Sequence, residues 1–289
     1  MSSLEIEPFY DRATSTWTYL VHRGRDAVII DPVLDYDPAS GAIAVASADR
    51  VLARVHEHGL IVHFVLETHA HADHLSASQY LKQQVGARIA IGSRICEVQQ
   101  TFAPVFGLAT LATDGSQFDR LLEDGDVVHA GAFSISVIAT PGHTPACVSY
   151  LIEDAVFTGD ALFVEDSGTG RCDFPRGNAA ALYRSVHDRL YELAPETRVC
   201  VGHDYQPNGR EPRWSSTIAA ERDHNIQLRA ATTLDEYVAV RTKRDATLSA
   251  PRLLLPSVQV NIAAGRLPMA EPNGRRYLRV PLTLPKQLP

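Results

Sequence analysis

The stretch Thr68-His69-Ala70-His71-Ala72-Asp73-His74 carries three histidines and one aspartate, directly after the apolar run Ile61-Val62-His63-Phe64-Val65-Leu66. A β-strand that ends in such a loop aims several imidazoles and a carboxylate at one point. Imidazole nitrogen and carboxylate oxygen together suit zinc and iron better than calcium or magnesium. A polar loop with chance histidines is the alternative, since the chain has 12 of them. Four ligand-type side chains so close together favour a metal site.

Three more ligand-type residues occur in a similar context further along the chain. His143 follows Gly142, Asp160 follows Gly159 and His203 follows Gly202, each just after a short apolar stretch. The ends of several strands can converge on one cleft, and glycine lets the backbone approach closely. Each residue alone could equally be a loop, capping or turn residue. The shared context predicts that all three complete the metal site.

Length and composition exclude several classes of protein. The 289 residues suffice for one large domain or two small ones, and 45% hydrophobic with 21% charged residues is ordinary for a soluble globular protein. The net charge of -7 without a basic cluster argues against nucleic-acid binding. The four cysteines form no C-x-x-C pair, which argues against a thiolate zinc site or a disulfide framework. We see no signal peptide and no membrane-spanning apolar stretch, so we expect a cytoplasmic protein that does not bind membranes.

Apolar periodicity predicts strands and helices that alternate through two halves, which indicates a layered α/β domain. Gly86 is the predicted C-cap of one helix, and Asn178 is the predicted N-cap of another. The predicted strands are 17–21, 27–31, 61–66, 88–91, 133–138, 147–152, 155–158 and 198–201. The predicted helices are 43–58, 76–85, 93–102, 178–193 and 214–229. From about Asp245 the chain gains prolines, and we expect an irregular extension there.

The order His-x-His-x-Asp-His, Gly-His-Thr, Gly-Asp and Gly-His resembles the metallo-β-lactamase superfamily. The resemblance implies an α/β fold, the αββα sandwich, with metal between the sheet edges. It divides the chain into a catalytic domain, residues 1–244, and a C-terminal extension, residues 245–289, packed on the domain or at a subunit contact. Within the superfamily, the segments 67–76, 167–174 and 202–205 look like the ETHE1-like persulfide dioxygenases. The tail segments 255–261 and 265–268 look like the bacterial branch of that group.

The persulfide dioxygenase resemblance implies one iron(II) per chain, held by His69, His143 and Asp160 as a two-histidine, one-carboxylate set. The expected reaction converts glutathione persulfide, O2 and water into glutathione and sulfite. Zinc stands above iron in the affinity order for divalent metals and could load in its place. The other four ligand-type residues of the pattern would hydrogen-bond the water on the metal and orient the ligands. These four are His71, Asp73, His74 and His203.

A glyoxalase II-like thioesterase is the rival enzyme. It would place His69, His71 and His143 on one metal and Asp73, His74 and His203 on a second metal, with Asp160 bridging, and hydrolyse an acyl-glutathione. Both enzyme groups contain these seven residues, so the residues do not distinguish a dioxygenase from a thioesterase. A metal-dependent binding or regulatory module is a third class, disfavoured because the ligand set is complete.

For the glutathione portion, Arg171 and Tyr205 are the candidate binding residues, by a bidentate carboxylate contact and by ring packing respectively. A role in loop structure or packing is an equal alternative for both. We expect small-molecule partners only, glutathione persulfide and O2, and a homodimer or larger homo-oligomer.

Overall fold

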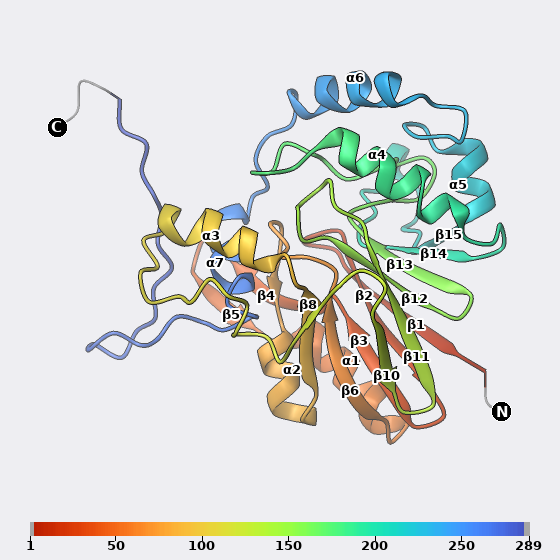
Figure 1. Ribbon diagram of the computed structural model, residues 1–289. Coiled ribbons are helices and arrows are strands. Elements are labelled where there is room, and N and C mark those ends of the chain that lie inside the picture. Colours follow the sequence, from red (N-terminus) through yellow and green to blue (C-terminus); the bar gives the residue numbers. More distant parts are fainter. Residues whose placement is uncertain (1–2, 286–289) are drawn as a thin grey trace.

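Two six-stranded sheets form the centre of the computed structural model, which describes residues 3–285 (Figure 1). The first sheet has the order β1-β2-β3-β6-β8-β9 and the second the order β10-β11-β12-β13-β14-β15. The first contains β1 (Glu5–Asp11), β2 (Thr16–Arg23), β3 (Asp26–Ile30), β6 (Ile61–Glu67), β8 (Arg88–Gly92) and β9 (Arg120–Leu122). The second contains β10 (Val127–Ala130), β11 (Phe133–Ala139), β12 (Val148–Ile152), β13 (Ala155–Gly159), β14 (Arg198–Val201) and β15 (Ser215–Thr217).

Along each strand, side chains alternate between the two faces of the sheet, and this alternation produces the layers of the fold. On β2, Tyr19 and Val21 are buried in a core shared by both sheets, whereas Leu20 is buried in a second core. Successive side chains of a strand point to opposite faces, so one sheet contacts the other sheet on one face and helices on its other face.

The helices form the outer layers. The second core includes apolar residues of α1 (Ala46–Glu57), α2 (Ser78–Val85), α3 (Ile95–Val105) and α7 (Leu254–Asn261). On the side of the second sheet lie α4 (Ala179–His187), α5 (Ile218–His224) and α6 (Leu234–Asp245) (Figure 1). The minor elements are η1 (Leu190–Glu192), η2 (Pro207–Gly209) and a small sheet of β5 (Ala42–Ala44), β4 (Val33–Asp37) and β7 (Leu75–Ser76). The predicted αββα sandwich is confirmed.

Local sequence signals located most elements correctly. Residues 17–21 lie in β2 and residues 27–30 in β3, which form an antiparallel pair, whereas Asp31 of the predicted strand follows β3. Gly86 ends α2 in the left-handed conformation, with φ of 71°. Asn178 caps α4, because its side chain accepts a hydrogen bond from the Ala181 amide.

Three predicted elements differ from the structure. The helix expected over 43–58 begins at Ala46, because Ala42–Ala44 pairs with β4. The helix expected over 178–193 ends at His187, followed by the short η1. The long helix expected over 214–229 is wrong: Ser215–Thr217 pairs with β14, Thr217 then caps α5, and α5 ends at His224.

The extension after Asp245 is more regular than expected, since it contains helix α7. Val258, Val260, Ile262 and Ala264 of this region are buried in the second core. Residues 286–289 of the predicted extension lie outside the described residues, and the division at residue 244 stays a prediction. Among residues 3–285, no helix has the length and apolarity to cross a bilayer.

Candidate metal centre

The histidine-rich loop joins β6 to β7 and is fixed at its start by Asp31. This buried aspartate follows β3, which pairs in parallel with β6. Its carboxylate accepts hydrogen bonds from the Thr68 amide (2.7 Å) and the Thr68 hydroxyl (2.8 Å). The loop therefore leaves the sheet edge in a defined direction, with His69, His71 and His74 buried.

The structure brings the other three predicted residues to the same edge. His143 follows β11, and Asp160 directly follows β13. His203 follows β14, which runs parallel to β13, so that Asp160 and His203 emerge next to each other. Close backbone approach makes this possible. A Cβ on Gly159, which has φ of +50°, would collide with the Thr68 side chain, and one on Gly142 would collide with the backbone of Leu182.

His69, His143 and Asp160 form one group of possible ligands. His143 donates its Nδ1 proton to the Arg171 carbonyl (2.6 Å), which leaves Nε2 as the free nitrogen, 3.5 Å from Asp160 Oδ2. The Thr68 hydroxyl donates to Asp31, so His69 Nδ1 donates to the Thr68 oxygen (3.0 Å) and its Nε2 is free. Burial and the neighbouring imidazoles of His71 and His143 lower the pKa of His69 well below its usual range. The neutral imidazole favoured here is the form that binds metals.

A second group consists of His71, Asp73, His74 and His203. His203 donates Nδ1 to the Ser15 carbonyl (3.2 Å), and its Nε2 lies 3.4 Å from Asp73 Oδ2. The same Nε2 lies 3.3 Å from Asp160 Oδ1. Since the other oxygen of Asp160 faces His143, this carboxylate stands between the two groups.

His71 differs from the other histidines because two buried carboxylates face it. Its Nε2 lies 3.0 Å from Asp31 and 3.5 Å from Glu67. Burial lowers the pKa of His71, but Asp31 and Glu67 outweigh this effect and raise it well above the usual range.

Unpaired buried atoms show that the site fits a metal. Within the described residues, several inward-facing ligand atoms are fully buried and have no hydrogen-bond partner. They are His69 Nε2, His71 Nδ1, His74 Nε2, His203 Nε2 and Asp160 Oδ1. Buried polar atoms without partners are costly, and a bound cation would satisfy lone pairs that converge in this way. The buried His/Asp clusters are thus suited to hold metal ions.

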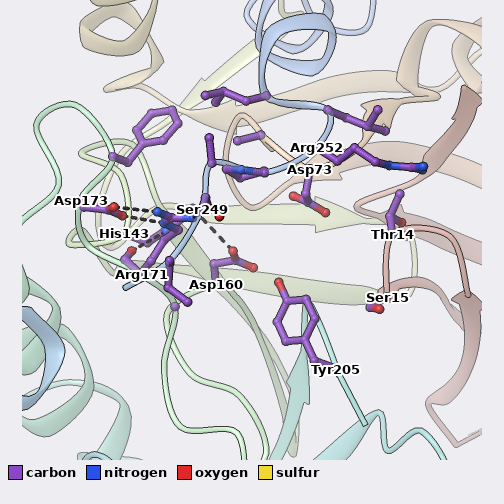
Figure 2. Close-up of a pocket in the computed structure, with 18 of the residues that line it drawn as sticks. Thr14, Ser15, Asp73, His143, Asp160, Arg171, Asp173, Tyr205, Ser249 and Arg252 are labelled. Atoms are coloured by element: carbon purple, nitrogen blue, oxygen red, sulfur yellow. Dashed lines mark hydrogen bonds and ion pairs between the residues drawn. The ribbon is translucent and has the colours of Figure 1, made fainter. Parts of the chain in front are cut away.

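A cavity of about 740 Å³ opens onto Asp73, His143 and Asp160 (Figure 2). Arg171 and Tyr205 both line it. The Arg171 guanidinium donates to both oxygens of Asp173 (2.6 and 2.7 Å) and to the Ser249 carbonyl (2.8 Å). The Tyr205 ring stacks on the His203 ring, with centroids 5.6 Å apart, and remains 59% exposed. Both residues are placed beside the metal ligands, and their substrate-binding role stays a prediction.

Sequence reasoning missed Asp31, Glu67 and Asn261 as parts of the site. Asp31 stands before Pro32, which marked only the end of a strand. Glu67 accepts hydrogen bonds from the hydroxyls of Ser76 and Ser78. Glu67 and Asn261 lie in the segments 67–76 and 255–261, which were noted only for their family resemblance. Their roles could not be derived from the sequence, because each depends on residues brought together by the fold.

Comparisons with known proteins agree with the geometry. A family model described as the metallo-beta-lactamase superfamily matches residues 11–203. The chain is 51% identical to a probable metallo-hydrolase of Burkholderia pseudomallei, over 96% of this chain and 99% of that protein. It is 44% identical to glyoxylase B2 of Dictyostelium discoideum, over 99% of both chains.

Proteins named ETHE1 are more distant. The chain is 31% identical to the mitochondrial persulfide dioxygenase ETHE1 of Bos taurus, over 90% of this chain and 88% of that protein. The crystal structure of ETHE1 from Myxococcus xanthus is 34% identical, with a TM-score of 0.73, and the match covers 91% of this chain and 100% of that one. The chain therefore belongs to the metallo-beta-lactamase superfamily, and it is a metal-dependent enzyme of that family.

Proposed function

We propose that the protein is a persulfide dioxygenase that converts glutathione persulfide, O2 and water into glutathione and sulfite. His69, His143 and Asp160 would hold one iron(II), which supplies the redox chemistry with O2 when bound. The observation that carries the proposal is that these two histidines and one carboxylate form a separate group. This set, with open coordination positions, is the one that non-haem iron oxygenases use.

The position of His71 fits a three-residue ligand set. A dinuclear hydrolase would need His71 as a ligand beside His69 and His143. In the structure His71 groups with Asp73, His74 and His203, and not with His69 and His143. Its Nε2 faces the carboxylates of Asp31 (3.0 Å) and Glu67 (3.5 Å), beside β3 and β6.

The cavity supports an anionic thiol-derived substrate. Besides Arg171, its lining includes Arg244 and Arg252, both exposed. Neither has a carboxylate within 4.0 Å in the part of the chain that the structure describes. Glutathione carries two carboxylates, which these guanidinium groups can bind with paired hydrogen bonds. Phe102 and Phe174 add apolar walls next to His143.

A dinuclear thioesterase acting on acyl-glutathione is the second candidate, and two observations favour it. Asp160 has one oxygen toward each ligand group, as a bridging carboxylate would. The names of the more similar relatives, a probable metallo-hydrolase and glyoxylase B2, also fit this candidate better than the dioxygenase. The unpaired Nδ1 of His71 could serve as a ligand atom in that case.

The number of metal ions per chain, measured together with assays of both reactions, distinguishes the dioxygenase from the thioesterase. The metal-free protein is loaded with iron(II) without oxygen and then supplied with O2 and glutathione persulfide, or with an acyl-glutathione thioester. We expect about one iron per chain, O2 uptake with sulfite release, and no thioester turnover. The His143→Ala variant should lose its iron. Two metals per chain with thioester turnover and no O2 uptake would establish the hydrolase instead.

The cytoplasmic location and the homo-oligomeric state also remain proposals. Purification of the protein under native conditions, followed by light scattering, would test the oligomeric state.

A further inference from the structure

Helix α7 reaches the metal centre through one buried side chain. Asn261 stands at the end of α7 and is only 4% exposed. Its amide nitrogen donates to the backbone carbonyls of His71 and of His74, both at 2.8 Å. Its carbonyl oxygen accepts a hydrogen bond from the Ser76 amide, also at 2.8 Å. Three hydrogen bonds from one residue thus span the second half of the metal-binding loop.

The backbone around α7 is fitted to the same place. Gly265, four residues past the helix, has φ of +77°, and a Cβ there would lie 3.0 Å from the Ser76 carbonyl. Val258 and Val260 anchor the helix in the core with no exposed surface. The segment is therefore fixed on both sides of Asn261, by the core before it and by the loop after it.

We propose that Asn261 is a positioning residue that holds the His71–Ser76 backbone in its metal-binding shape, so that the C-terminal segment completes the metal centre. The residue lies far outside the part of the chain matched by the superfamily model, residues 11–203. The proposal concerns the loop and not the substrate, so it holds for either reaction considered above.

The physical reason is the cost of leaving buried backbone groups unpaired. Without the Asn261 side chain, the carbonyls of His71 and His74 and the Ser76 amide would lose their partner in residues that are at most 2% exposed. The loop would relax to pair these groups elsewhere, and this would move the Asp73 and His74 side chains. Groups that orient metal ligands in this way typically change metal affinity by about 10–100-fold when they are removed.

Gln259 on the same helix provides a matched control. It is also buried, at 5% exposure, and also makes three side-chain hydrogen bonds. Its amide nitrogen donates to the carbonyls of Leu255 (2.7 Å) and Arg279 (2.8 Å), and its oxygen accepts from the Arg279 amide (2.9 Å). These bonds hold the C-terminal chain and none reaches the metal-binding loop. Gln259→Ala therefore copies the loss of a buried amide without touching the loop.

The experiment compares Asn261→Ala and Gln259→Ala in the full-length, metal-free protein. Zinc(II) affinity is measured by competition with a chelator, and deuterium uptake is measured for peptides covering residues 68–76. We expect Asn261→Ala to weaken zinc binding about 10-fold or more and to speed exchange in the loop. Gln259→Ala should change the zinc affinity less than about 3-fold, although both variants lower the melting temperature.

Equal zinc affinities in the two variants would overturn the proposal and leave Asn261 a purely structural residue. If Asn261→Ala does not fold, Asn261→Ser makes the same comparison with a smaller loss, because its hydroxyl keeps one donor and one acceptor. These readouts use no substrate, so they stand apart from the outcome of the dioxygenase test.

Discussion

Asp31 Oδ1 lies 3.0 Å from His71 Nε2, and both side chains are at most 3% exposed. The same carboxylate holds the Thr68 amide and hydroxyl. Because a buried charge without its partner is strongly destabilising, we expect Asp31→Asn to lower the free energy of unfolding of the metal-free protein by about 3 kcal/mol. Urea unfolding followed by circular dichroism would measure the loss.

The Asp26–His63 pair is a suitable comparison for this prediction. It has a shorter contact, 2.7 Å, but each side chain is about a quarter exposed. We expect Asp26→Asn to cost less than about 1 kcal/mol, since solvent screens such pairs. Losses of the same size in both variants would contradict the importance assigned to burial.

The close approach at Gly142 leads to a second prediction. A Cβ at this position would collide with the backbone and Cβ of Leu182 in α4, and the residue has φ of +147°. We expect Gly142→Ala to lower the free energy of unfolding by about 3 kcal/mol and to weaken metal binding, because His143 is the next residue. Gly59→Ala is the control, since Gly59 has φ of +59° but open space around it. Gly59→Ala should lower the free energy of unfolding by only about 1 kcal/mol.

The ligand set could be predicted from sequence because each ligand stands in the loop that follows a strand. Asp160 and His203 follow β13 and β14, whose apolar residues and flanking glycines are visible without a structure. Parallel pairing of these two strands then places both residues at one edge. A local sequence pattern was sufficient to find these ligands, because their positions depend only on where the strands end.

The supporting residues could not be predicted, because they act across long sequence separations. Asn261 bonds to a carbonyl 190 residues earlier in the chain. The error at residues 214–229 has a similar cause. A polar sequence compatible with a helix is recruited at Ser215 by the free edge of β14, and pairing in a sheet overrides local propensity.

A buried glutamate on α5 gives a pH-dependent prediction. Burial raises the pKa of Glu221 to about 8, and Asn225 donates to its carboxylate (2.8 Å). The folded state therefore keeps a proton that the unfolded chain releases near its ordinary pKa of 4.5. Stability contributed by this group is complete at low pH and is lost as the pH rises toward 8.

Replacing the Glu221 carboxyl by an amide should abolish the fall in stability at high pH. We expect Glu221→Gln to be more stable than the wild type at high pH, by a margin that grows by about 3 kcal/mol between about pH 6 and pH 9. Urea unfolding at several pH values would measure the margin, and Glu211→Gln at an exposed position controls for the loss of one charge. A margin that is independent of pH would show that Glu221 is ionised in the folded protein.

The last prediction concerns the cationic lining of the cavity. In Figure 2, Arg171 and Arg252 lie on opposite sides of the view, with Asp160 and Asp73 between them. Arg171 is already bound to Asp173 and Ser249, whereas Arg252 is exposed and makes no ion pair within 4.0 Å among residues 3–285. Arg252 is thus the better placed of the two to take a substrate carboxylate.

Arg252→Ala should therefore raise KM for a glutathione-derived substrate about 10-fold and leave kcat within about 2-fold. The carboxylate it would bind is remote from the reacting sulfur, so the contact stabilises the ground state and the transition state equally. Steady-state kinetics over a range of salt concentrations would test this, because screening should reduce the difference between variant and wild type. Arg275→Ala, at an exposed position that does not line the cavity, is the matched control. An unchanged KM would mean that the substrate carboxylates bind elsewhere. A fall in kcat alone would place Arg252 in contact with the reacting part of the substrate.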